Sequence, residues 1–247
     1  MLLAATAASA QENPLWMRYP SISPDGSKIA FAYKGDIFCV DVNGGEARQL
    51  TTNPAYDYKP VWSPDGSKIA FASNREGGFD VYVMDARGGE PRRLTTNSAG
   101  EIPVTWRDNN HIVFQSSVMP TAESIIFAGS FVEEYVVDLD GHRPTLFSTL
   151  QMDDISINTR GEVLYHDNKG YEDKWRKHHT SPIARDIWLK KDGKFSKLTS
   201  FAGEDRSPVW AADGQSYYYL SEQDGTFNIY INKVAGGNPQ QLTRFSG

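Results

Sequence analysis

The 247-residue sequence has few of the features that reveal a function directly. Cys39 is its single cysteine, so no disulfide can form within the chain. Beyond residue 10, no apolar run approaches the roughly 20 residues of a membrane span. GxSxG, GxGxxG, P-loop and HExxH motifs are absent, which removes the usual signatures of a nucleophile elbow, of phosphate binding and of a zincin zinc site. The net charge of −6 argues against nucleic acid or anionic lipid as the main partner.

What the sequence does contain is a repeat. Residues 20–31 read PSISPDGSKIAF and residues 60–71 read PVWSPDGSKIAF, so that Ser23 and Ser63 lie 40 residues apart (63 − 23). A weaker copy, PVWAADGQSYYYL, begins at Pro208. A period of ~40–45 residues is typical of the four-stranded blades of a β-propeller. We therefore expect an all-β propeller of four-stranded antiparallel blades.

Five blades can be placed within a propeller domain that covers residues 14–247. Their approximate ranges are 17–52, 58–96, 103–149, 153–200 and 207–244. Five blades either close a ring or form part of one, and the sequence leaves both possibilities open. Two residue types recur at fixed places in the blades: an aspartate in the first turn and a tryptophan just before it. The aspartates are Asp25, Asp65, Asp108 and Asp213, and the tryptophans are Trp62, Trp106 and Trp210.

This recurrence favours structural over catalytic roles, because a catalytic group is not needed once per blade. Aspartate in a Pro-Asp-Gly turn caps the turn through its side chain. The tryptophans are expected to pack between blades or to lie at the rim of the propeller.

The first 13 residues resemble the end of a secretory signal. A short apolar run precedes Ala8-Ser9-Ala10, which has the small-x-small form of a cleavage site before Gln11. They predict an exported, periplasmic protein. The alternative is a flexible apolar N-terminus.

Two insertions interrupt the repeat, at residues 117–130 in blade 3 and 167–185 in blade 4. The second combines aromatic and charged side chains, which predicts contact with a peptide or a protein. The alternative is a solvated connector that covers a blade edge. Neither a cofactor nor a metal site is expected, because adjacent histidines in a charged loop are usually solvated. The candidate binding residues are Tyr171, Glu172, Asp173, Trp175, Arg176, His178, His179 and Arg185.

The repeat SPDGSKIAFAS, followed by DVYVMDARGGEPRRLT, resembles the propeller repeats of TolB, of tricorn proteases and of prolyl-oligopeptidase-type peptidases. The repeat alone does not distinguish these families, but four other passages do. They are LWMRYPSISPDGSKIAFAYKGDIF, SAGEIPV, GYEDKWRKHHTSPIARDIW and AGEDRSPVW. They are similar to the N-terminal propeller of exported bacterial tricorn-like serine peptidases.

The resemblance implies a propeller that is followed by a PDZ domain and a peptidase core, and that steers or filters peptides toward that core. The catalytic residues of such proteins lie in the later domains, so none is expected in this chain. The first propeller of the family generally has more than five blades, which implies a longer protein. Two alternatives remain open: a TolB-like periplasmic protein-binding propeller, and a metal-dependent carbohydrate enzyme that uses the region of His178 and His179.

Overall fold

The computed structural model describes residues 16–117, 132–170 and 180–246, and every regular element in these ranges is a β-strand. The strands form five four-stranded antiparallel sheets, which confirms the predicted propeller of five blades. Blade 1 contains β1 (Arg18–Ile22), β2 (Lys28–Tyr33), β3 (Asp36–Asp41) and β4 (Arg48–Gln49). Blade 2 contains β5 (Asp57–Trp62), β6 (Lys68–Glu76), β7 (Gly78–Asp85) and β8 (Arg92–Arg93).

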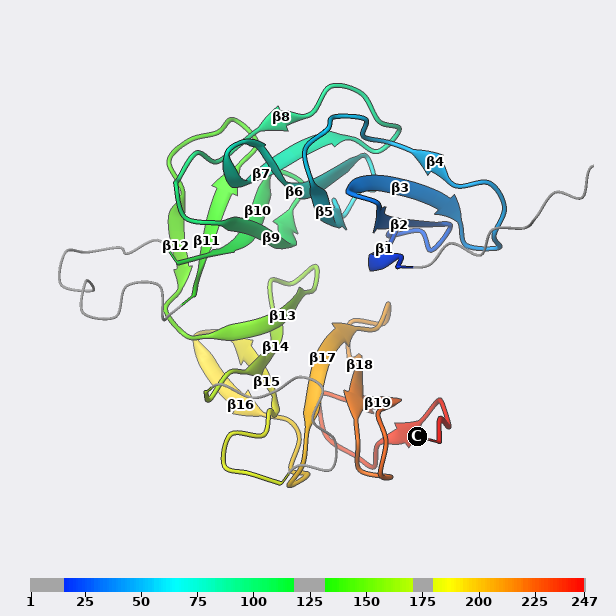
Figure 1. Cartoon of the computed structure of the whole chain (residues 1–247). Coiled ribbons are helices and arrows are strands. Elements are labelled where there is room, and N and C mark those ends of the chain that lie inside the picture. Colours follow the sequence, from blue (N-terminus) through cyan, green and yellow to red (C-terminus); the bar gives the residue numbers. More distant parts are fainter. Residues whose placement is uncertain (1–15, 118–131, 171–179, 247) are drawn as a thin grey trace, which may run out of the picture.

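The other three blades follow the same order along the chain. Blade 3 contains β9 (Glu101–Asp108), β10 (His111–Ser116), β11 (Glu133–Asp138) and β12 (Thr145–Ser148). Blade 4 contains β13 (Met152–Ile157), β14 (Val163–Asp167), β15 (Ile187–Lys191) and β16 (Lys194–Lys197). Blade 5 contains β17 (Asp205–Trp210), β18 (Ser216–Ser221), β19 (Asn228–Lys233) and β20 (Gln240–Gln241). The sheets follow one another around a common centre, with β1, β5, β9, β13 and β17 innermost (Figure 1).

The Ser-Pro-Asp-Gly turn joins the first two strands of a blade through its own side chains. Ser63 Oγ donates a hydrogen bond to Asp65 Oδ1 at 2.6 Å and accepts one from the Lys68 amide at 2.9 Å. Gly66 takes the positive φ, 70°, that the turn requires. The bond from Ser63, with those from Ser67, lowers the pKa of Asp65 to about 2. The structural role predicted for this aspartate is therefore confirmed.

The hydrophobic core is divided among the four interfaces between consecutive blades. Side chains alternate along each strand, so one blade contributes to the interface on either side of it. Phe71 and Ile69 pack in the blade 1–blade 2 interface, whereas their neighbour Ala70 packs against blade 3. Val113 and Leu164 continue the pattern into the next two interfaces. Among the described residues, no such buried cluster joins blade 5 to blade 1.

The recurring tryptophans connect each blade to the one before it. Trp62 Nε1 donates to the Ser21 carbonyl at 3.0 Å, and Trp106 Nε1 donates to the Val61 carbonyl at 3.0 Å. Trp210 Nε1 donates to the carbonyl of Glu162, in the preceding blade, at 3.2 Å. The indoles thus fill space between blades and satisfy their one donor there, as inter-blade packing predicts.

Candidate functional site

One end of the sheets carries both insertions. In each blade the connection between the second and third strands lies at the end where the innermost strand begins. The strand ends that flank the two long connections, those of β10 and β11 and those of β14 and β15, therefore lie on the same side of the propeller. We call this side the insertion rim. The opposite side carries, in every blade, the turn between the first and second strands and the hairpin between the third and fourth strands.

The candidate binding residues of the blade 4 insertion lie mostly outside the described part of the chain. Tyr171, Glu172, Asp173, Trp175, Arg176, His178 and His179 all belong to the range 171–179, which is not described. Their role in binding stays a prediction. The exception is Arg185, which lies just before β15.

Arg185 is buried and held by a carboxylate of the next blade. Its Nη1 atom lies 2.7 Å from Glu204 Oε1, and its backbone amide donates to Glu204 Oε2 at 3.1 Å. Both side chains are less than a tenth exposed. A buried guanidinium with a buried partner is costly to separate. Arg185 therefore connects the end of the insertion to blade 5, and its guanidinium forms an ion pair within the protein.

A buried histidine lies beside this ion pair. His166 Nδ1 accepts a hydrogen bond from the Ser207 amide at 3.2 Å, so the proton of the neutral ring is on Nε2. Nε2 lies 3.8 Å from Asp153 Oδ2, and Nδ1 lies 3.7 Å from Asp154 Oδ2. Burial lowers the pKa of His166 despite these two carboxylates. The imidazole is therefore neutral at physiological pH.

This group of residues does not form an activated nucleophile. Ser207 Oγ donates to Asp154 Oδ2 at 2.6 Å, and it is the Ser207 backbone amide that contacts His166. A serine nucleophile needs its hydroxyl proton within reach of a base that can accept it, usually a histidine nitrogen. The arrangement holds β13 and β17 together instead.

The innermost strands share an unusual backbone conformation at one position. Tyr19, Lys59, Asp154 and Ser207 have φ between 49° and 54°, in the left-handed region. Each lies where the pairing with the second strand of its blade shifts register. Bulges of this kind redirect side chains and recur at functional positions. The same position thus carries a different chemical group in each of four blades.

Each inter-blade interface also holds two carboxyl groups near the insertion rim. In three interfaces one comes from an equivalent residue at or next to the beginning of the third strand, and the other from the start of the innermost strand of the next blade. In the blade 3–blade 4 interface both carboxyl groups lie one residue further along their strands. Each pair is close enough for one carboxylate to raise the pKa of the other. The pairs are Asp36 and Asp57, Asp80 and Glu101, Glu134 and Asp153, and Asp186 and Asp205.

Basic side chains neutralise three of these pairs. Arg75 Nη2 lies 2.7 Å from Asp57, and Arg93 Nη2 lies 2.8 Å from Asp80. In the blade 4–blade 5 interface, the ammonium groups of two lysines contact one carboxylate. Lys169 Nζ and Lys197 Nζ lie 2.6 Å and 2.9 Å from Asp186.

The blade 3–blade 4 interface is different. Glu134 is fully buried, and no described lysine or arginine pairs with it or with Asp153. Burial, with a smaller contribution from Asp153, raises the pKa of Glu134 to about 8. Glu134 is therefore protonated at neutral pH. The sequence analysis missed these carboxyl groups. An acidic residue recurs at the same two positions in the other three interfaces, but in the blade 3–blade 4 interface these positions are Glu133 and Met152.

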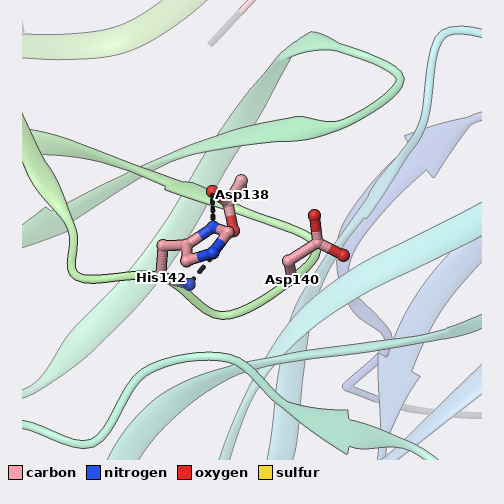
Figure 2. Close-up of side chains that lie close together, drawn as sticks. All are labelled: Asp138, Asp140 and His142. Carbon is pink, nitrogen blue, oxygen red and sulfur yellow. Dashed lines mark hydrogen bonds and ion pairs between the residues drawn. The ribbon is translucent and has the colours of Figure 1, made fainter.

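One exposed group has the geometry of a metal site. Ligand atoms of Asp138, Asp140 and His142 lie within 4.8 Å of one another in the β11–β12 hairpin (Figure 2). His142 Nδ1 lies 2.6 Å from Asp138 Oδ2, and the His142 amide donates to Asp138 Oδ1. Asp41 and Asp85 cap the equivalent hairpins of blades 1 and 2 in a similar way. Hairpin capping therefore accounts for Asp138 and His142.

The sequence profile of the tricorn protease N-terminal β-propeller domain matches residues 14–247. The chain belongs to this family. The match covers almost the whole chain, and it agrees with the five blades observed.

Two solved structures are similar to this propeller. The crystal structure of the tricorn protease has a TM-score of 0.74 and 22% sequence identity, and the match covers 93% of this chain but 22% of that one. A putative TolB from Agrobacterium tumefaciens has a TM-score of 0.72 and 18% identity, with 92% of this chain and 80% of that chain covered. These likenesses show the fold that the tricorn N-terminal propeller shares with TolB.

A third similar structure bears on the carbohydrate-enzyme alternative. Oligogalacturonate lyase in complex with manganese has a TM-score of 0.57 and 19% identity, with 92% of this chain and 66% of that chain covered. At this identity the likeness concerns the fold alone. No curated protein matches the sequence. The described residues include no helix that is long and apolar enough to cross a membrane.

Proposed function

We propose that this chain is the propeller module of a tricorn-like peptidase, and that it binds and steers peptides without cleaving them. The family match over residues 14–247 is the observation that carries this proposal. In the full-length protein, the peptidase activity would belong to other domains. Export of the protein, which the first 13 residues favour, is part of the same proposal.

Two features of the site support a binding role. The innermost strands carry an aromatic, a cationic, an anionic and a hydroxyl side chain at one equivalent position, in Tyr19, Lys59, Asp154 and Ser207. Such a mixture can contact a polypeptide of varied sequence. Among the described residues near His166, the hydroxyl of Ser207 is committed to Asp154 rather than to the imidazole, which favours binding over catalysis.

The test uses the purified chain and a fluorescently labelled unstructured polypeptide. Anisotropy measures binding, and mass spectrometry of the same samples measures cleavage. We expect saturable binding with no new peptide termini after prolonged incubation. Cleavage that scales with chain concentration and is lost in the Ser207→Ala variant would contradict the proposal, and so would the absence of binding at millimolar peptide.

A further inference from the structure

A cavity of about 360 Å³ lies at the insertion rim between blades 1 and 2. Three parts of the chain meet around it: the start of β1, the turn between β2 and β3, and the residue before β5. Three aromatic and two basic side chains line it, and none of the described lining residues is acidic. They are Trp16, Tyr33, Tyr56, Arg18 and Lys34. The cavity therefore combines apolar walls with positive charge.

The β2–β3 turn holds Tyr56 in position. Gly35, in this turn, has a φ of 90°, and a Cβ atom there would lie 3.3 Å from Tyr56 Cδ2. The absence of a side chain at position 35 lets the ring pack against the turn. The Asp57 amide donates to the Gly35 carbonyl at 2.7 Å, and the Tyr56 amide donates to Asn74 Oδ1 at 2.7 Å. One wall of the cavity is therefore in place before a ligand binds.

The aromatic surface extends beyond the cavity. Between ring centroids, Tyr56 lies 5.7 Å from Tyr58 and 6.4 Å from Phe79. Tyr58 in turn lies 5.4 Å from Tyr19, on β1. Trp16 and Tyr56 are 75% and 43% exposed, although tryptophan is highly buried on average. Exposed tryptophan and tyrosine are enriched where proteins bind partners, so these rings mark a binding surface.

The charge of the cavity disfavours a cationic ligand. The Arg18 guanidinium lies 5.3 Å from the centre of the Trp16 ring, and the Lys34 ammonium lies 5.2 Å from the centre of the Tyr33 ring. Aromatic cages bind ammonium ligands over the faces of their rings. Here the chain's own cations already lie over two of the rings, so an anionic group is the complementary ligand.

The carboxylates next to the cavity in sequence already have partners. Asp36 Oδ2 accepts a hydrogen bond from Gln49 Nε2 at 3.0 Å, and its Oδ1 accepts one from Thr51 Oγ1 at 3.1 Å. Asp57 is fully buried, and its Oδ2 lies 2.7 Å from Arg75 Nη2. Among the described residues, no carboxylate therefore neutralises the two cations of the cavity.

We infer that this cavity binds an acidic aromatic segment of a peptide: an aromatic side chain between Trp16 and Tyr56, with neighbouring side-chain carboxylates at Arg18 and Lys34. The inference rests on the proposed peptide-binding function and names the sequence that this function would prefer. Stacking against the rings would hold the aromatic side chain. Charge-assisted hydrogen bonds from the guanidinium and the ammonium would hold the carboxylates.

The experiment compares three peptides on the full chain by titration calorimetry. Each is a seven-residue Gly/Ser peptide with blocked ends and a central Glu-Trp-Glu, Gln-Trp-Gln or Glu-Ala-Glu. We expect Glu-Trp-Glu to bind at least tenfold tighter than Glu-Ala-Glu, and about threefold tighter than Gln-Trp-Gln. The second difference should shrink at high salt, because salt screens exposed charges.

The outcomes separate this inference from the proposed function. Equal affinity for all three peptides would overturn the aromatic site and leave peptide binding intact. Binding of none of them would also overturn it, whereas the proposed function is judged separately, by the labelled polypeptide. Trigalacturonate carries carboxylates on sugar rings, which can also stack on aromatic side chains. If it bound tighter than Glu-Trp-Glu, the cavity would be a carbohydrate site and the inference would fail.

A double variant tests the two cations. Arg18→Gln with Lys34→Gln should abolish the preference for Glu-Trp-Glu over Gln-Trp-Gln and leave the affinity for Gln-Trp-Gln unchanged. Arg92→Gln with Lys194→Gln removes the same two charges from exposed positions on β8 and β16, and it should keep the preference. An unchanged preference in the first double variant would contradict the inference.

A second variant tests the aromatic wall. Tyr56→Ala should weaken binding of Glu-Trp-Glu about tenfold and leave the affinity for Glu-Ala-Glu unchanged. Phe195→Ala, which removes an exposed ring from blade 4, is the control and should change neither affinity. Since Tyr56 is half exposed, the variant is expected to fold, which circular dichroism verifies. A folded Tyr56→Ala protein that binds Glu-Trp-Glu as the wild type does would overturn the inference.

Discussion

The blade 1–blade 2 and blade 3–blade 4 interfaces have similar hydrophobic cores but differ in the charged residues at the insertion rim. In both, buried side chains of consecutive strands alternate between the two sides of a sheet. At the insertion rim, Arg75 neutralises Asp57 in the first interface, whereas in the second Met152 is at the position of Asp57 and Glu134 is buried with no described cation beside it. The repeat therefore determines how the blades pack, whereas a few polar positions determine the charge at each interface.

The largest expected effect on stability concerns the hydrophobic core that both interfaces contain. Phe71 is fully buried between blades 1 and 2. Phe71→Ala should lower the free energy of unfolding by about 3–5 kcal/mol, since it removes a buried ring and leaves a cavity. Phe195→Ala, on the exposed outermost strand of blade 4, is the control, and urea denaturation compares the two. A smaller loss at Phe71 than at Phe195 would show that the interface core is not essential.

The next effect tests the charged end of the blade 1–blade 2 interface. Arg75→Gln leaves Asp57 buried without a cation, which should cost about 3–5 kcal/mol. Asn168→Gln, after the second strand of blade 4, removes no charge and should cost far less. Similar losses for the two variants would remove the difference between the interfaces. Adding Asp57→Asn to Arg75→Gln should recover part of the lost stability.

The pH dependence of stability should come partly from Glu134. Its pKa is about 8 in the folded protein and 4.5 in the reference state, so the folded state holds a proton that the unfolded state has lost between these values. Stability therefore falls as the pH rises through this window, by at most about 1.4 kcal/mol per unit. Asp205, with a pKa of about 6, contributes in the same direction at the lower end.

The measurement is urea denaturation of the wild type and of Glu134→Gln at intervals from pH 6 to pH 8. The variant should show a flatter dependence on pH. Asp213→Asn, in the exposed turn between β17 and β18, should show the wild-type dependence, because the lowered pKa of Asp213 lies outside this range. Parallel curves for the wild type and Glu134→Gln would contradict the assignment of the proton to Glu134.

The smallest effect concerns the tryptophans that connect the blades. Trp106→Phe keeps most of the buried ring and removes the bond from Nε1 to the Val61 carbonyl. The loss should be about 1 kcal/mol, the usual net value of one hydrogen bond. Thermal denaturation followed by circular dichroism suffices to measure it. A loss of stability as large as that of Phe71→Ala would mean that the packing of the indole contributes far more than its hydrogen bond.

The fold could be predicted from the sequence because each repeat contains local patterns that are typical of its turns and strands. The Pro64-Asp65-Gly66 turn and the position of Trp106 each follow from residues within one blade. The carboxyl pairs could not be predicted in this way, because Glu134 and Asp153 meet only when two blades stack. Arg185 shows the same limit: its partner, Glu204, is in the next blade, and no local sequence pattern indicates the pairing.

The most direct test of the difference between the interfaces is the titration of Glu134 itself. Carbon-13 NMR of the glutamate side-chain carboxyls, assigned by comparison with Glu134→Gln, gives its pKa in the folded protein. A resonance that titrates near pH 8 is the predicted result. A resonance that titrates near 4.5 would show that this interface carries an ordinary carboxylate, and it would contradict the account.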